Sequence, residues 1–300
     1  MKKILSLSLA FLLSLPYICK CQFHLDMEFV PYQDTLNPLD ALFAQFKWRN
    51  SSNRKIKVIR PEWNHTIQVR RLQPISTDWQ NRGGLSDVGG GGIAGESWEI
   101  EVPIGYNFGV HYMICPDGQN EYLAINNKIL LGFQPGEYQV RCIYFPSLQP
   151  KIKKGDDPFI GDGSCCKVIE FTFTVLDSPP ADEAALYDFL IKNDLANYIH
   201  HHRYAPENIP LFEEALLLAP ETSSLKPFIH QAVADLLTRQ LYNAPKPYSD
   251  EELAILYERI VYHMRKVVES KHPYLLQNLS TDLSNYQFEL QAVNARLRRK

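Results

Sequence analysis

Two kinds of hydrophobic pattern divide the chain. Between residues 22 and 177, apolar and polar side chains alternate in short runs, most clearly at 42–48, 98–102, 138–144 and 169–175. A period of two places one face of a strand on a core and leaves the other face polar. Several such runs, separated by Gly, Pro and Asn, predict an antiparallel β-sandwich.

The pattern changes after Ser178-Pro179-Pro180, because two prolines cannot continue a strand ladder. Apolar steps of three and four then predict helices, the fourth of which begins at Ser249 with a capping-box sequence ending in Glu252. Residues 181–300 are expected to form a small α-helical bundle. The first expected helix begins at residues 182–183. The others span about 209–219, 224–242, 249–267 and 274–297.

The N-terminus has the features of a secretory signal peptide. Met1-Lys2-Lys3 is followed by an apolar stretch over residues 4–15 and then by Pro16. The stretch is shorter than the roughly 20 residues of a membrane span. Cleavage after Cys21 would leave an exported chain with no transmembrane span. The expected location is periplasmic, cell-surface or extracellular, and a lipid anchor at the cysteine stays open.

The charge balance argues against nucleic acid as a partner. Residues 1–21 contain three lysines and no acid, so the remaining chain has 28 basic and 34 acidic residues, a net charge of −6. Nucleic-acid binding calls for a basic face. The basic segment 296–300 is interpreted as the favourable cationic end of a helix.

Four cysteines would remain after cleavage, and an even count in an exported chain indicates one or two disulfides. In the strand pattern, Cys142 and Cys165 both fall on inward faces of neighbouring strands, so they are the expected disulfide. The alternative is that they are buried free thiols. The four are Cys115, Cys142, Cys165 and Cys166.

The segment 133–141 contains a tight turn at Pro135-Gly136 followed by Tyr138 at the start of a strand. It resembles the tyrosine corner of immunoglobulin-like and fibronectin type III domains. The resemblance implies an immunoglobulin-like sandwich over residues 22–177. It also implies a structural role for Tyr138, whose ring packs inward while its hydroxyl bonds back to the turn. Extracellular sandwiches of this kind usually bind or space rather than catalyse.

The stretch 213–224, followed by a helix with small residues at Ala232 and Ala234, resembles a tetratricopeptide helix hairpin over residues 213–241. No second copy occurs at the family's spacing, so the resemblance is confined to one junction. It implies a helical surface on which a peptide or a partner helix could dock.

The metal-like motifs favour no bound metal or cofactor. Neighbouring residues of a helix point about 100 degrees apart, so the run 200–202 of three histidines cannot converge on one ion. Asp156, Asp157 and Asp162 do not follow the spacing of a calcium loop. They are interpreted as polar residues that keep an exposed loop soluble.

No catalytic residue is assigned. The sequence has no G-x-S-x-G elbow and no phosphate-binding fingerprint, and no nucleophile signature surrounds Cys165 or Cys166 as partners of His111. Two segments, 81–95 with seven glycines and the charged 146–164, are interpreted either as recognition loops or as disordered insertions.

These observations favour an exported, non-enzymatic cell-envelope protein with a binding or assembly role. Its helical half would dock a protein partner or an envelope component. A secreted hydrolase is the alternative, with a cleft between the domains that gathers His111, the 146–164 segment and acids of the helical half. A proteinase inhibitor that acts through a protruding loop is a further alternative.

Overall fold

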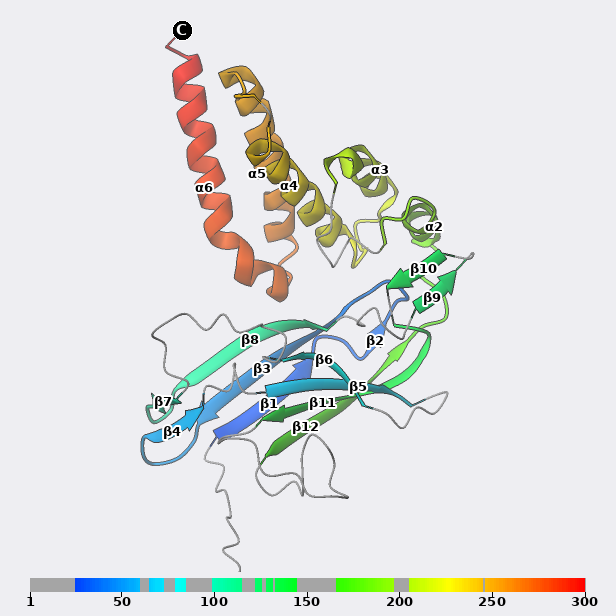
Figure 1. Ribbon diagram of the computed structural model, residues 1–300, viewed down its shortest axis with the longest axis vertical. Coiled ribbons are helices and arrows are strands. Elements are labelled where there is room, and N and C mark those ends of the chain that lie inside the picture. The colour runs from blue at the N-terminus through cyan, green and yellow to red at the C-terminus, as the bar shows by residue number, and fades with distance from the viewer. Residues whose placement is uncertain are drawn as a thin grey trace, which may run out of the picture.

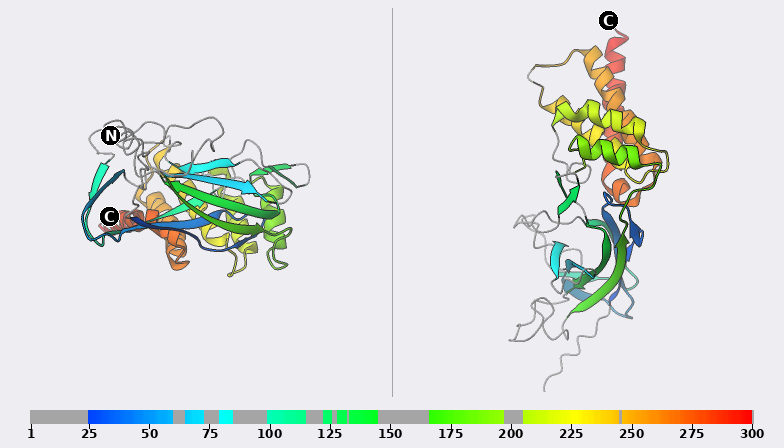
Figure 2. Two further views of the ribbon diagram at one scale, coloured as in Figure 1. Left: turned by 90° about the horizontal axis from the view of Figure 1, so that it is seen from below. Right: turned by 90° about the vertical axis from the view of Figure 1, so that its right-hand side faces the viewer.

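A computed structural model describes residues 25–59, 65–72, 79–84, 99–114, 122–125, 128–131, 133–144, 166–196, 205–244 and 246–299. Strands lie between residues 25 and 175 and helices between 184 and 297 (Figure 1). The β region and the helical region follow one another along the long axis of the molecule, as Figure 1 and the right-hand view of Figure 2 show. The predicted order, β then α, is confirmed.

The β region contains two main sheets. One has three antiparallel strands in the order β1-β3-β8, and the other has five strands in the order β2-β12-β11-β5-β6. Strands β4 and β7 form a separate ladder, as do β9 and β10. The strands are β1 (Leu25–Pro31), β2 (Thr35–Leu36), β3 (Leu42–Asn50), β4 (Ile56–Ile59), β5 (His65–Arg71), β6 (Gln80–Gly84), β7 (Glu99–Val102), β8 (Asn107–Ile114), β9 (Tyr122–Ile125), β10 (Lys128–Leu131), β11 (Gly136–Tyr144) and β12 (Lys167–Val175).

The two main sheets share one apolar core. Phe29 of β1 lies with its ring centroid 5.5 Å from that of Phe171 in the other sheet. Phe46 and Trp48 of β3 are buried in the same core as Val140 of β11. The period of two in β3, β11 and β12 therefore reflects one face covered by the opposite sheet.

Strands β11 and β12 pair antiparallel, as their patterns predicted. Tyr138 lies opposite Phe173 and Cys142 lies opposite Ile169. The rings of Tyr138 and Phe173 are almost completely buried.

Two features of the five-stranded sheet differ from the prediction. Strand β2 runs parallel to β12, with Leu36 beside Val175, so the sheet is mixed rather than antiparallel. In addition, Gly83 and Gly84 of the glycine-rich segment belong to strand β6, where they pair with β5. Backbone groups alone make these ladder bonds, so residues without an alternating side-chain pattern can form a strand.

The helices begin and end within about two residues of their predicted limits. Helix α4 packs against both α3 and α5, while α6 packs against α5 and reaches strand β8. None of the described helices combines the length and hydropathy needed to cross a bilayer. The helices are α2 (Ala184–Lys192), α3 (Ile209–Leu218), α4 (Lys226–Tyr242), α5 (Asp250–Glu269) and α6 (Pro273–Leu297), with a 3₁₀ turn at Pro206–Asn208.

Helix α5 begins with the predicted capping box. The hydroxyl of Ser249 accepts from the backbone N–H of Glu252 at 3.2 Å, and the Glu252 carboxylate accepts from the Ser249 N–H at 2.8 Å. We expect Ser249→Ala to lower the free energy of unfolding by about 1 kcal/mol and the melting temperature by about 2–4 °C. Thermal melts should show no such loss for Ser178→Ala, which changes an exposed serine between β12 and α2. Equal losses in the two variants would contradict the role of the cap.

The β region and the helical region are joined by side chains of β3 and the loop before it. Phe43 of β3 stacks on Phe228 of α4, with ring centroids 5.1 Å apart. Its ring also lies 4.6 Å from His272 and 5.2 Å from Tyr274 at the start of α6. Leu39 belongs to the same buried cluster as the helical core. The two regions therefore share a hydrophobic junction.

Candidate functional site

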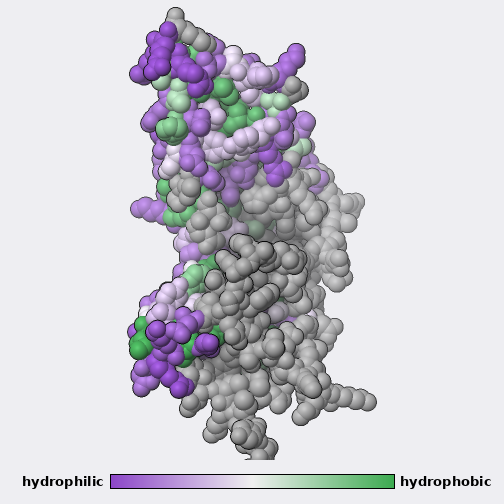
Figure 3. Space-filling model, turned by 60° about the vertical axis from the view of Figure 1, so that its left-hand side comes forward, coloured by the Kyte–Doolittle hydropathy of each residue, from purple (hydrophilic) through white to green (hydrophobic). Residues whose placement is uncertain are grey.

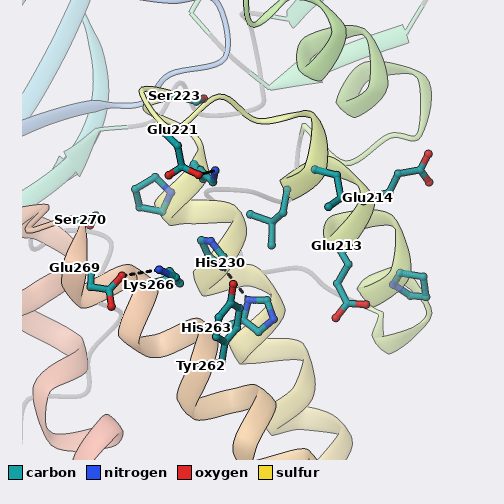
Figure 4. Close-up of a pocket in the computed structure, with 15 residues that line it drawn as sticks. Glu213, Glu214, Glu221, Ser223, His230, Tyr262, His263, Lys266, Glu269 and Ser270 are labelled. Atoms are coloured by element: carbon teal, nitrogen blue, oxygen red, sulfur yellow. Dashed lines mark hydrogen bonds and ion pairs between the residues drawn. The ribbon is translucent and has the colours of Figure 1, made fainter.

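A large pocket lies in the helical region. It has a volume of about 860 Å³ and is open to solvent between α3, the first half of α4 and the second half of α5 (Figure 4). The residues that line it are Pro210, Glu213, Glu214, Leu216, Leu217, Glu221, Ser223, Lys226, Pro227, His230, Tyr262, His263, Lys266, Glu269 and Ser270. We call this pocket the helical groove.

Helical spacing explains which side chains face the groove. On α3, Glu213, Glu214 and Leu217 follow Pro210 by three, four and seven residues, so all four share one face. On α5, Tyr262 and Lys266 are four residues apart. The opposite face of α3 buries Phe212 and Ala215 in the helical core.

Two buried histidines lie side by side in the groove. His230 of α4 and His263 of α5 are 6 % and 5 % exposed, and their Nδ1 atoms are 2.9 Å apart. In such a hydrogen bond one ring must donate and the other must accept, so at least one imidazole is neutral.

The environment of the pair favours the neutral form of both rings. Burial and then Lys226 and Lys266 lower the pKa of His230 from 6.5 to about 4. Burial and then His230 lower the pKa of His263 to about 3. Neither ring is expected to carry charge at neutral pH.

Charged pairs surround the histidines. Lys226 binds Glu221 at 2.6 Å, and Lys266 binds Glu269 at 2.8 Å. On the α3 side, Glu213 accepts from Arg259 at 2.7 Å. Lys226 lowers the pKa of Glu221, so that carboxylate is ionised at neutral pH.

The groove is acidic overall. Four glutamates and two lysines line it, both histidines are neutral, and Arg259 beside the lining pairs with Glu213, which leaves a net charge of −1. Glu214 is exposed on α3, and no basic partner for it is found within the described ranges. The acidic excess therefore lies on the α3 side.

An apolar surface adjoins these charges. Leu217 is 87 % exposed and Tyr262 is 54 % exposed, although both side chains could have been buried by a different packing. The described helical surface in Figure 3 is mainly hydrophilic, with small apolar patches. Leu217 and Tyr262 therefore give the groove exposed apolar side chains beside its charged ones.

The two histidines of the groove use their Nδ1 atoms to bond to each other. No group of three or more His, Cys, Asp or Glu side chains is placed to hold a metal ion in the part of the chain described.

The expected disulfide involves a residue outside the described ranges. Cys142 is 1 % exposed in the β core, where it is a free thiol whose pKa is raised by burial. Cys165 and Cys115 lie outside the described residues, and Cys166 packs with Ile143. The pairing of Cys142 with Cys165 stays a prediction.

Tyr138 makes the contact that its position predicted. Its hydroxyl donates to the carbonyl oxygen of Gln134 at 2.8 Å, and its ring is 0 % exposed. The ring stacks on Phe173 and meets Phe133 edge-on, each with centroids 5.1–5.2 Å apart. Tyr138 therefore links the turn to the core and performs a structural role.

His111 lies at the junction of the two regions. Its Nδ1 shares a hydrogen bond with the hydroxyl of Tyr32, and burial lowers the pKa of His111. Tyr32 also contacts His272 edge-on at 5.7 Å. Cys166 lies elsewhere, beside Ile143. The run 200–202, the three aspartates at 156, 157 and 162, the segment 146–164 and most of 81–95 lie outside the described residues.

Sequence reasoning missed the histidine pair. His230 and His263 are 33 residues apart and belong to no motif. Each stands on the buried face of its helix, which was the available signal. A histidine on the buried face of a helix is more often a core residue with its hydrogen bonds satisfied. Its position therefore could not indicate that a second histidine is its partner.

Comparison with known proteins gives little guidance. No protein-family model and no curated protein matches the chain. A β-glucosidase from Listeria innocua in complex with gluconolactone is 12 % identical with a TM-score of 0.29, covering 52 % of this chain and 16 % of that chain. The β-glucosidase EmGH1 from Erythrobacter marinus is 14 % identical with a TM-score of 0.27, covering 51 % of this chain and 16 % of that chain.

The CARDB domain of the PF1109 protein from Pyrococcus furiosus, in complex with di-metal ions, is 9 % identical with a TM-score of 0.24. That match covers 51 % of this chain and 92 % of the domain. The chain spans about a sixth of the β-glucosidases it matches. Likenesses at these TM-scores support no statement about activity or ligands.

Proposed function

We propose that this protein is an exported binding or assembly protein of the cell envelope, whose helical groove docks a segment of a partner protein. The observation that carries the proposal is the exposed Leu217 on an acidic wall of a pocket of about 860 Å³. Export rests on the signal-like residues 1–21.

The partner segment is expected to be basic and apolar. Glu214 favours a lysine or arginine side chain, and Leu217 favours an apolar neighbour of that residue. In the pairs Lys226–Glu221 and Lys266–Glu269 each lysine is neutralised by its glutamate. These lysines would therefore line the groove without attracting an acidic ligand. An acidic segment would meet the net negative charge of the lining and be rejected.

The fold is consistent with a scaffold role. The hydrogen bond of Tyr138 and the two facing sheets support an immunoglobulin-like sandwich as the finer assignment of the β region. The α3–α4 hairpin likewise supports a tetratricopeptide-like docking surface. Together they describe a rigid sandwich that holds a helical binding surface.

The geometry at the junction does not favour the hydrolase alternative. The cavity there has a volume of about 220 Å³ and is lined by apolar side chains and by polar ones, among them Asp40, Ser224 and His272. His111, the base expected in such a cleft, is not among the described residues that line it. Asp40 is the acid that lines it, and this carboxylate already accepts hydrogen bonds from Asn37 and Ser224.

Binding of synthetic peptides tests the proposal. We expect the purified protein to bind fluorescent peptides of about twelve residues that contain adjacent Lys or Arg and Leu, and to discriminate against Glu-containing counterparts. Leu217→Asp should weaken binding by about 30-fold, the effect of losing a central contact. Glu214→Lys should weaken the basic peptides and strengthen the acidic ones. Fluorescence anisotropy measures each affinity.

Two matched substitutions on α6 serve as controls. Phe288→Asp places the same charge at another exposed apolar residue, which is 68 % exposed. Glu289→Lys makes the same charge reversal as the α3 variant at an exposed site outside the groove. Absence of binding, or equal losses in Leu217→Asp and Phe288→Asp, would sink the proposal.

A further inference from the structure

The loop between β2 and β3 carries an acidic residue into the helical region. Asp40 is 7 % exposed, and its Oδ2 accepts from the backbone N–H of Asn37 at 3.1 Å. Its Oδ1 accepts from the hydroxyl of Ser224 at 2.8 Å, in the turn before α4. Asp40 therefore connects the β region to the helices through a buried carboxyl group.

A second buried carboxyl group lies at the same turn before α4. Glu183, just before α2, is 4 % exposed, and its carboxylate is hydrogen-bonded by the side chain of Ser223. Because Ser223 and Ser224 are adjacent, both carboxyl groups lie next to the same dipeptide. Burial and then the negative charge of Asp40 raise the pKa of Glu183, as expected for neighbouring acids. Figure 4 shows Ser223 in the turn above the helical groove.

No described basic side chain compensates the two acids. Neither Asp40 nor Glu183 forms an ion pair with any described residue. The charged groups that act on Glu183 are Asp40 and Asp182, which are both acidic. The N-terminus of α2 offsets part of the charge of Glu183. Burying two carboxyl groups together without a counter-charge is otherwise unfavourable.

One oxygen of this pair lacks a donor among the described residues. Oε2 of Glu183 is buried and accepts no hydrogen bond from any of them. A buried acceptor without a partner is costly, and native structures usually satisfy it with protein, water or an ion. The uncompensated charge and the unsatisfied oxygen therefore point to the same missing kind of partner, a cation.

The surrounding ligands are oxygen atoms. The hydroxyls of Ser223 and Ser224 contact the two carboxylates. The hydroxyl of Tyr187, one turn along α2 and 2 % exposed, lies close enough for both acids to raise its pKa. The cavity of about 220 Å³ next to Asp40 leaves room for water. Calcium binds oxygen ligands, above all carboxylates, carbonyls and water, and this turn offers two carboxylates and room for water.

We propose that the junction binds one calcium ion between the carboxylates of Asp40 and Glu183. The ion neutralises both charges and supplies the partner of Oε2 of Glu183. Since Asp40 belongs to the β region and Glu183 to the helical region, the bound ion holds the two regions together. The site touches the edge of the helical groove at Ser223 but contains none of the α3 residues of the proposed docking surface, so the two proposals are tested by different variants.

Calcium titration of the purified protein tests the site. We expect about 5 mM CaCl₂ to raise the melting temperature by about 5 °C or more relative to EDTA, and calorimetry to give one ion per chain. Asp40→Asn and Glu183→Gln should each abolish the shift. In EDTA both variants should be at least as stable as the wild type, because each removes one of two repelling charges and keeps the side-chain shape.

The exposed neighbour of the site provides the control. Asp182→Asn removes an acid of the same segment and should keep most of the calcium response. Terbium luminescence gives a second readout. The wild type should bind terbium and lose the luminescence when calcium is added, whereas Asp40→Asn should bind no terbium. The proposal fails if calcium produces no shift, or if the shift persists in Asp40→Asn and Glu183→Gln.

Discussion

Replacing Phe43 by alanine is expected to lower the free energy of unfolding by about 3–5 kcal/mol, the usual cost of truncating a buried phenylalanine. The ring is 5 % exposed and meets Phe228, His272 and Tyr274 within 5.2 Å between centroids. It is an aromatic side chain of the β region that belongs to the helical core. Its loss should therefore weaken the coupling between the two regions as well as the total stability.

Calorimetry distinguishes these two effects. The wild type should unfold in one transition, because a shared core makes the regions cooperative. Phe43→Ala should show two, with the helical region melting first, since Phe228 and His272 lose the ring on which they pack. Phe288→Ala removes a ring that is 68 % exposed and should change stability by less than about 0.5 kcal/mol. A single transition with a small shift in Phe43→Ala would show that the regions are not joined at this residue.

Phe43 also illustrates how far the β region could be predicted. Alternation identified β3, β11 and β12 because one face of each strand meets the core. The same alternation assigns Phe43 to the polar face of β3, where the helices in fact cover it. Strand β2 has only two residues, Thr35 and Leu36, which is too short for any period. Its parallel pairing depends on where the chain returns, and that is decided by tertiary contacts.

The helical region was predicted more completely than its groove. Caps and apolar steps depend on residues three and four apart, so the sequence determines where α5 begins and which face of it is buried. Whether His230 meets His263 depends instead on how α4 and α5 slide against each other. A shift of one turn, about 5.4 Å, would separate the two rings. The apolar periodicity of each helix does not determine the axial position of α4 relative to α5.

The histidine pair predicts a specific loss of stability in acid. Both folded-state pKa values lie below the ordinary value of 6.5, so the unfolded chain takes up protons first as the pH falls. The stability that the neutral pair contributes is complete above about pH 6.5 and is lost as the pH falls toward about 4. The groups around the pair are Lys226, Lys266, Arg259, Glu221 and Glu269.

The size of the effect follows from the shift of His230. A lowering from 6.5 to about 4 corresponds to about 3 kcal/mol for the first proton that enters the pair. The hydrogen bond between the two Nδ1 atoms tolerates this first proton, because the charged ring donates and the neutral ring accepts, whereas a second proton removes the acceptor. Urea unfolding between about pH 7 and about pH 4.5 measures the slope of stability against pH.

Glutamine at both positions should flatten this slope. His230→Gln/His263→Gln keeps two polar side chains in the groove and removes both titrating rings. The slope of the free energy of unfolding against pH should therefore fall by about 1.4 kcal/mol per pH unit for each proton that unfolding no longer takes up. Tyr262→Phe changes a ring beside the pair and leaves both histidines in place, so its slope should match that of the wild type. The comparison uses slopes, so a uniform loss of stability from the substitutions does not affect it. If the double variant keeps the wild-type slope between about pH 5 and about pH 6.5, the acid sensitivity arises elsewhere, and the buried pair is not its cause.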